Sequence, residues 1–291
     1  MSSSGWPRSA SSGLDELTGR MPEVSRLAVV GWLTVFVLFE WARFKFITFS
    51  GEWDTLYQHI SALECLELVL IARMIDLRGR SPRVGSVEAA AILAAAAFFT
   101  LFATSRPIFS AGLLALFVLV RFGRDPAYRF FAIGLFAFIG QYLLLTGPFI
   151  WLHDASALGD AWLTRHVMDL AGFGVVGAGT FIMRPAADFG VNVVWGCTTS
   201  YVAAAVAPGF VIVVLALRRG WRRSDFGWLA GLLLATFGVN LVRLVLTSIS
   251  HEEHRFWHDG AGSAVFAVGY MVLVGVFAAM ATRRQRLEPA A

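Results

Sequence analysis

Residues 225–249 read DFGWLAGLLLATFGVNLVRLVLTSI, an apolar run that contains one arginine, Arg243. About twenty apolar residues suffice for a helix to cross the hydrocarbon core of a bilayer. An arginine at that depth costs about 2.5–3.5 kcal/mol on insertion scales, so it usually faces the interior of a helix bundle and has a role. The stretch therefore predicts a transmembrane helix that packs among other helices.

Seven further apolar runs lie along the 291-residue chain. We expect spans at residues 26–48, 57–75, 86–104, 107–122, 127–150, 198–217 and 262–282. Only 15% of the residues are charged, against about a quarter in soluble domains, and the mean hydropathy is +0.66. The sequence predicts an all-α polytopic membrane protein with about eight transmembrane helices.

The longest segment between spans is 151–197. Residues 162–172 mix apolar and polar side chains and predict a short helix at the membrane interface. The stretches 180–183 and 191–195 resemble short strands, and the turn-rich RPAADFG lies between them. This pattern predicts a short external β-hairpin directly before the sixth span.

Arginines cluster beside four of the predicted links, and counting spans places all four clusters on the side of the N-terminus. The clusters are Arg78, Arg80 and Arg83; Arg121, Arg124 and Arg129; Arg218, Arg219, Arg222 and Arg223; and Arg283, Arg284 and Arg286. Cytoplasmic loops carry an excess of Lys and Arg. We therefore expect a multi-pass protein of the inner or plasma membrane with both termini in the cytoplasm. The clusters also account for the net charge of +4, so no nucleic-acid partner is expected.

The predicted organisation has three parts. Residues 1–25 are rich in Ser and Gly, lack an apolar core, and predict a disordered cytoplasmic tail without a cleavable signal peptide. Residues 26–282 form a single transmembrane domain in the lipid bilayer. Residues 283–291 form a cytoplasmic C-terminal tail.

Cys197 lies at the predicted external mouth of the sixth span. If a helix begins there, its free N–H groups and partial positive charge would lower the pKa of the thiol and favour the nucleophilic thiolate. The alternative is a buried structural cysteine. Arg243 lies in the outer third of the seventh span, with Asn240 and Thr247 on the same helical face. Its alternative role is to extend toward the external headgroups.

Three of the six histidines, His251, His254 and His258, follow the seventh span. Their spacings of three and four allow a metal or haem site, although the HExxH pattern fails because Arg255 stands where its second histidine is needed. His251 and His254 are interpreted as a solvated pair, whereas His258 directly precedes the last span and can face Cys197. Three spans thus bring a thiol, a guanidinium and an imidazole to one membrane face, and these groups suffice for acyl transfer.

Four pieces of sequence then match a known family in order and spacing. They are the Gly-rich stretch Val176–Met183, the stretch Val191–Trp195 that leads into Gly196-Cys197-Thr198, the run Asn240-Leu241-Val242-Arg243, and His258 with Gly262. Over roughly residues 125–282 the chain resembles the exosortase/archaeosortase family of membrane-embedded cysteine transpeptidases. The usual Cys-Ser-Gly is Cys197-Thr198-Thr199 here, as expected of a divergent branch.

The resemblance implies that Cys197 is the nucleophile, Arg243 stabilises the oxyanion and His258 exchanges protons with the thiol. We expect Asn240, Thr198 and His254 to contact the substrate, and we expect no cofactor and no metal. The implied substrates are membrane-anchored proteins whose C-terminal signal combines a short motif, a transmembrane helix and a basic tail.

Two other classes of function stay open at this point. In a binding module or transporter, Arg243 would recognise an anionic substrate and Cys197 would only pack. In a metal or haem protein, His251, His254 and His258 would be ligands. Substitution of Cys197 tests the first alternative, and metal content or a visible absorption band tests the second.

Overall fold

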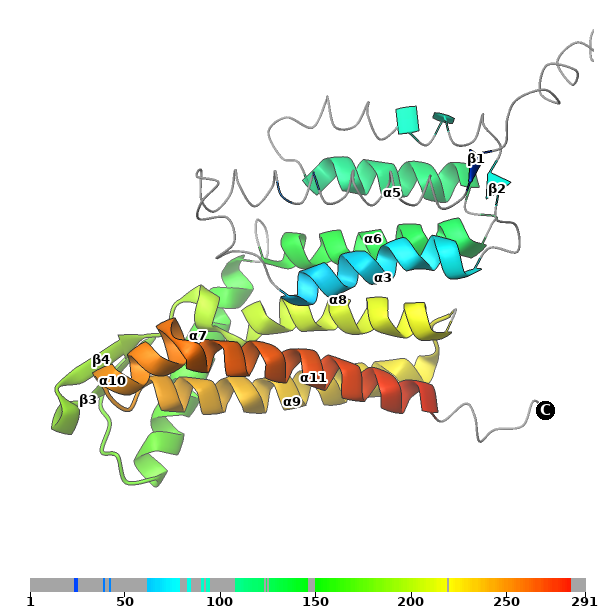
Figure 1. Ribbon diagram of the computed structural model, residues 1–291. Coiled ribbons are helices and arrows are strands. Elements are labelled where there is room, and N and C mark those ends of the chain that lie inside the picture. Colours follow the sequence, from blue (N-terminus) through cyan, green and yellow to red (C-terminus); the bar gives the residue numbers. More distant parts are fainter. Residues whose placement is uncertain are drawn as a thin grey trace, which may run out of the picture.

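The architecture is known from a computed structural model that describes residues 62–78, 108–122, 126–145, 150–218 and 220–283, with short pieces at 24–25, 39, 42, 83–84, 90–91, 93–94 and 124. The predicted spans 26–48 and 86–104 and the two tails lie almost entirely outside these residues. The described part is mostly helical. Its helices run side by side, with one helix and a hairpin at one end of the bundle (Figure 1).

The helices and strands follow in a simple order. They are β1 (Val24–Ser25), α3 (Ala62–Arg78), β2 (Arg83–Val84), α5 (Ile108–Phe122), α6 (Pro126–Leu145), α7 (Ile150–Leu170), β3 (Phe181–Arg184), β4 (Phe189–Asn192), α8 (Thr199–Arg218), α9 (Arg223–Thr247), α10 (His251–His254) and α11 (Ala261–Arg283). A 3-10 turn, η5 (Trp195–Cys197), precedes α8, and a π-helical turn, η6 (Arg255–Asp259), precedes α11.

Three described helices are long and apolar enough to cross a membrane, namely Thr199–Leu217, Arg223–Thr247 and Ala261–Arg283. They agree within two residues with the predicted spans 198–217, 225–249 and 262–282. The prediction of a helical membrane protein is confirmed at this level, because these runs keep few charges over about twenty residues.

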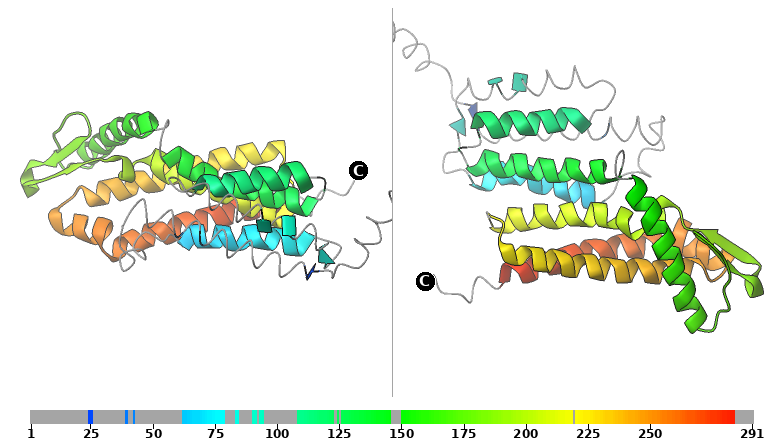
Figure 2. Two further views of the ribbon diagram at one scale, coloured as in Figure 1. Left: turned by 90° about the horizontal axis from the view of Figure 1, so that it is seen from above. Right: turned by 180° about the vertical axis from the view of Figure 1, so that it is seen from behind.

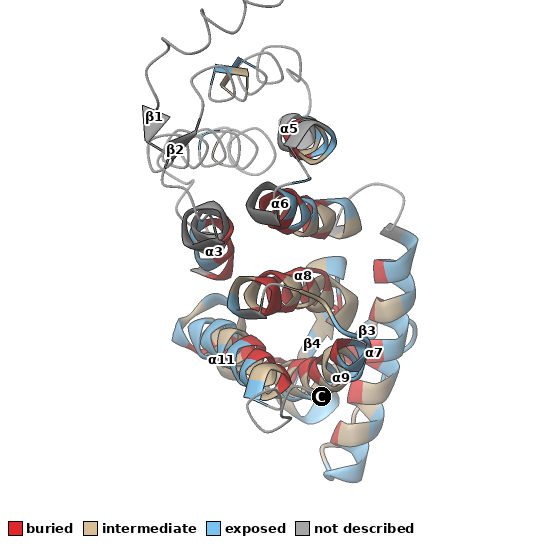
Figure 3. Ribbon diagram, turned by 90° about the vertical axis from the view of Figure 1, so that its right-hand side faces the viewer, coloured by how far each residue is buried: buried red, intermediate tan, exposed pale blue. Residues whose placement is uncertain are grey.

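Helix α8 lies between two packed groups (Figure 3). On one side, α3, α5 and α6 build a core around fully buried residues such as Leu114 and Leu135. On the other side, α9 and α11 pack against α8 around Phe210, Leu232 and Val274. The central position of α8 matters for the site, since Cys197 directly precedes this helix.

Helix α7 is inclined to the bundle and lies across its end, next to the hairpin (Figure 2). The sequence predicted a short helix at 162–172, but α7 is 21 residues long and begins at Ile150. The fifth span was expected to continue to residue 150, whereas α6 ends at Leu145. Residues 146–149 of that predicted span lie outside the described residues, and the inclined helix α7 follows from Ile150.

The predicted hairpin forms before α8. Strands β3 and β4 pair antiparallel, with Phe181 opposite Asn192 and Arg184 opposite Phe189. The second strand, Phe189–Asn192, begins two residues before the predicted 191–195. It also ends earlier, since residues 195–197 form the 3-10 turn. Arg165 of α7 donates from Nη1 to the carbonyls of Gly179 and Phe181, at 2.9 and 2.8 Å, and so joins the hairpin to α7.

Candidate active site around Cys197

Cys197 ends the 3-10 turn η5 and is buried between α7 and α9. Its N–H donates to the carbonyl of Val194 at 2.8 Å. Its own carbonyl accepts from Nδ2 of Asn240 in α9, at 3.1 Å, and the same amide contacts Oγ1 of Thr199 at 3.2 Å. The backbone around the thiol is thus fixed from both sides, which is the arrangement a positioned nucleophile needs.

A buried carboxylate, Asp160 of α7, caps α8 from outside that helix. Oδ2 accepts from the N–H of Thr199 at 2.7 Å, and Oδ1 accepts from its hydroxyl at 3.0 Å. Ser156 donates to Oδ2 at 3.1 Å. The negative charge that favours a helix N-terminus is therefore supplied by Asp160, which sequence reasoning did not identify.

The environment of the Cys197 thiol corrects one prediction. Burial raises the pKa of Cys197, the nearby Arg243 and the Val194 backbone contact oppose that rise, and Asp259 adds to it. The sequence predicted a lowered pKa on the assumption that a helix begins at Cys197. The helix begins two residues later, and its N-terminal N–H groups are used by other acceptors. The resting thiol therefore needs a base to remove its proton.

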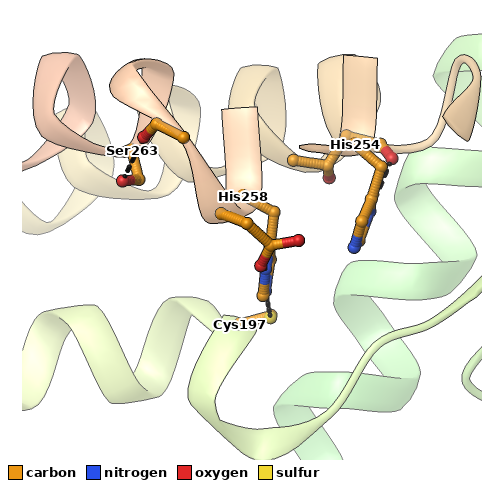
Figure 4. Close-up of polar contacts among 7 residues, drawn as sticks. Cys197, His254, His258 and Ser263 are labelled. Atoms are coloured by element: carbon orange, nitrogen blue, oxygen red, sulfur yellow. Dashed lines mark hydrogen bonds and ion pairs between the residues drawn. The ribbon is translucent and has the colours of Figure 1, made fainter. Parts of the chain in front are cut away.

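His258 supplies an imidazole at the thiol. Its Nε2 lies 3.4 Å from Sγ of Cys197, and Figure 4 shows the two side chains pointing toward one another. His258 lies in the turn η6, next to the start of α11. A side chain at Gly262 would collide with Trp257 of this turn, so the glycine four residues after His258 permits the close return of the chain.

His254 lies beside His258 without touching the thiol. The two rings are stacked, with centroids 4.8 Å apart and 12° between their planes. Nδ1 of His254 is 3.0 Å from the carbonyl of Thr247 at the end of α9. His251 is exposed and packs on Phe189 of the hairpin, with ring centroids 5.9 Å apart. The three loop histidines therefore do not gather into one set.

Arg243 lies on the wall of a cavity of about 300 Å³ between α8, α9 and α11. Gly196, the neighbour of Cys197, also lines this cavity, together with apolar and aromatic residues such as Phe266, Tyr270 and Met271. Arg243 is the one charged side chain among the described lining residues, and it makes no hydrogen bond or ion pair within the described part of the chain. An unpaired guanidinium facing an apolar cavity is suited to binding a negative charge.

The backbone N–H groups of residues 197–200 already donate hydrogen bonds. Besides Cys197 and Thr199, the N–H of Thr198 donates to Trp195 O at 3.1 Å and that of Ser200 to Ser156 Oγ at 3.3 Å. None of these N–H groups is free to bind an oxyanion. Arg243 is the one charged donor on the described wall of the cavity.

Two of the three residues expected at the substrate have structural partners instead. Thr198 is fully buried, donating to Trp195 O at 2.7 Å and accepting from the N–H of Tyr201 at 3.2 Å. Asn240 is fully buried and holds the Cys197 turn. These contacts hold the turn of Cys197, and the role of both residues at a substrate stays a prediction. His254, half-buried beside His258, keeps its predicted proximity to the site.

Side chains beside the thiol also offer atoms of the kind that bind metal ions. Donor atoms of His254, His258 and Asp259 lie within 4.8 Å of one another, whereas the sequence had grouped His254 and His258 with His251. Nδ1 of His258 is 2.7 Å from Oδ1 of Asp259, and Nδ1 of His254 faces the Thr247 carbonyl. These contacts account for the arrangement within the protein, so we assign it no metal.

The fold and the site together define a class: a helical membrane protein with a buried thiol and an imidazole in contact at one end of its spans, beside a cavity whose described lining carries one charge, that of Arg243. Comparison with known protein families supports this class. The profile of the transmembrane exosortases matches residues 53–275, which is most of the chain, and the protein therefore belongs to the transmembrane exosortase family. No curated protein and no solved structure matched the chain.

Proposed function

We propose that this exosortase is a membrane cysteine transpeptidase or protease that cleaves C-terminal sorting signals of exported proteins through a thioester on Cys197. The observation that carries the proposal is the 3.4 Å contact between Sγ of Cys197 and Nε2 of His258. A thiol within hydrogen-bonding reach of an imidazole is the arrangement of an activated nucleophile. Family membership supports the same reaction class.

The proposed reaction has two stages. Nε2 of His258 takes the thiol proton, the thiolate of Cys197 attacks the scissile carbonyl, and the guanidinium of Arg243 stabilises the oxyanion. When the C–N bond breaks, His258 returns the proton to the leaving amine, and the acyl group stays on sulfur as a thioester. An amine or water then attacks the thioester, and the thiol is regenerated. The attacking group decides between transfer and hydrolysis.

The proposed substrates are membrane-anchored proteins with a short C-terminal motif, a transmembrane helix and a basic tail. The cavity beside Cys197 lies between membrane-spanning helices, so a substrate held by its own helix reaches the thiol at the end of the bundle. We further propose the topology with about eight spans, cytoplasmic termini and an external site. It agrees with the arginines that border α8, α9 and α11 at the ends remote from Cys197.

The test follows precursor size in cells that co-express the protein with a tagged candidate substrate from the same genome. Cys197→Ala and Cys197→Ser should leave the precursor uncleaved, whereas Cys65→Ala, which removes the other cysteine, should process it. A hydroxylamine-sensitive adduct on Cys197 is expected in the wild type. Normal processing by both Cys197 variants would overturn the proposal.

One observation favours a second candidate. Within the described part of the chain, Arg243 has no hydrogen-bond or ion-pair partner and carries the only charge on its cavity wall, which would also suit a protein that binds an anionic substrate without cleaving it. In that case function would survive in Cys197→Ala and be lost in Arg243→Ala. The metal or haem alternative has weaker support, since the ligand atoms that lie close together belong to His254, His258 and Asp259, and His251 is not among them.

A further inference from the structure

The carboxylate of Asp259 contacts the ring nitrogen of His258 that is remote from the thiol. Its Oδ1 lies 2.7 Å from Nδ1 of His258, so Cys197, His258 and Asp259 form a continuous chain of contacts. Nothing in the sequence motifs had assigned Asp259 a role. We propose that Asp259 is a positioning residue that holds His258 in the tautomer able to accept the Cys197 proton, an inference that rests on the proposed function.

The argument begins with the hydrogen between the two residues. The hydrogen bond to His258 lowers the pKa of Asp259, so its carboxylate is ionised at neutral pH and has no proton to donate. Nδ1 of His258 must then carry the hydrogen and donate it. In neutral imidazole this leaves a lone pair on Nε2, the atom 3.4 Å from Sγ of Cys197. Transfer of the thiol proton to Nε2 produces an imidazolium, which the adjacent carboxylate stabilises.

The π-helical turn Arg255–Asp259 makes this contact between sequence neighbours possible. The turn is tight: a side chain at Gly260 would meet the carbonyl oxygens of Arg255 and Phe256 at 2.9 and 3.0 Å. The two other carboxylates of the loop do not contact His258. Glu253 accepts from Nε1 of Trp257 at 2.7 Å, and Glu252 is exposed. Within the described loop, Asp259 is thus the acid that contacts His258.

The other charged and titratable groups around His258 are few. His254 stacks on its ring, Arg255 acts on Asp259 through space, and Arg243 acts on Cys197. Through space, the negative charge of Asp259 disfavours the thiolate of Cys197. If Asp259 acted on Cys197 through its charge alone, neutralising it would speed alkylation of the thiol. If Asp259 positions His258, neutralising it slows alkylation, so the two cases can be told apart.

The experiment measures the rate at which iodoacetamide alkylates Cys197 across the pH range, in the full-length protein in membranes. The Cys65→Ala background leaves Cys197 as the only thiol. Asp259→Asn should slow alkylation at neutral pH about tenfold and move the profile upward by about one pH unit. Asp259→Glu should restore part of the rate. Glu252→Gln removes the same charge from the same loop and should leave the profile unchanged.

The outcomes separate the two proposals. Slower alkylation in Asp259→Asn, with partial rescue by Asp259→Glu, supports the inference. If Asp259→Asn alkylates as fast as the parent or faster while His258→Ala is slow, the inference fails and the proposed function stands. If His258→Ala is unchanged, the thiol–imidazole exchange of the proposed function fails. Asp259 is exposed, so equal melting temperatures of the parent and Asp259→Asn are expected and are checked in parallel.

Discussion

The two turns that meet at the site are held in different ways. Cys197 is the buried residue of its turn, and the turn is held by Asn240 from α9 while Asp160 from α7 holds the adjoining start of α8. The turn that carries His258 is open to solvent, with 34% of the His258 side chain and 63% of the Asp259 side chain exposed. One side of the reaction centre is thus part of the core, and the other is part of the surface.

This difference indicates a division of labour. Cys197 stays where two helices place it, because moving it would break several buried hydrogen bonds. His258, the proposed base, lies on the link between α9 and α11, where fewer buried contacts resist movement. We therefore expect substitutions on the Cys197 side to reduce stability and activity together, and substitutions on the His258 side to reduce activity alone.

Arg243 belongs to neither turn, and after Cys197 itself its substitution should have the largest effect. Arg243→Gln removes the donor expected to stabilise the oxyanion, so the cleavage rate should fall by about 10²–10³. Arg243→Lys keeps the charge but loses the planar fork, and an intermediate loss is expected. The measurement is the rate of precursor cleavage, normalised to the amount of protein in the membrane.

Arg223→Gln is the matched control, since it removes an exposed arginine from the other end of α9. Loss of an intramembrane charge should not hinder insertion, so membrane levels of Arg243→Gln should equal those of the wild type. A cleavage rate in Arg243→Gln within a few-fold of the control would remove Arg243 from the proposed mechanism.

Asp160 tests the buried side of the comparison. Asp160→Ala leaves the N–H and hydroxyl of Thr199 without their acceptor and uncaps α8, which should cost about 1–3 kcal/mol of stability. The melting temperature and the cleavage rate should fall together. Asp154→Ala changes an exposed residue of the same helix and should alter neither. A full melting temperature with a reduced rate in Asp160→Ala would contradict the supporting role.

Much of this arrangement follows from local sequence. The spans α8, α9 and α11 agree with prediction within two residues, because an uninterrupted apolar run admits few other structures in lipid. Arg243 was identified because an arginine in such a run raises the free energy of membrane insertion. The hairpin was found from its turn residues, and its second strand was misplaced because the 3-10 turn at Trp195 ends the extended segment earlier.

The supporting residues were missed because their roles depend on partners far away in the chain. Asp160 is unremarkable in its own helix, and only the fold brings it to Thr199, 39 positions later. The pKa of Cys197 was predicted in the wrong direction for the same reason, since burial between α7 and α9 is not visible in residues 195–201. Asp259 directly follows His258 in the sequence, and this adjacency could have identified it. The π-helical turn that brings the two side chains into contact has no clear sequence pattern.

The smallest expected effect tests the exposed side of the comparison. His254→Ala removes the ring that stacks on His258. Aromatic pairs of this kind contribute about 0.5–1.5 kcal/mol, so the cleavage rate should fall about two- to tenfold through a less well-oriented base. The melting temperature should change little, because the loop contributes few buried contacts.

His251→Ala, which alters an exposed ring on Phe189, is the control and should cleave at the wild-type rate. Equal rates in the two variants would show that the stack does not orient His258, and a large drop in melting temperature for His254→Ala would show that this turn is held as firmly as the one that carries Cys197.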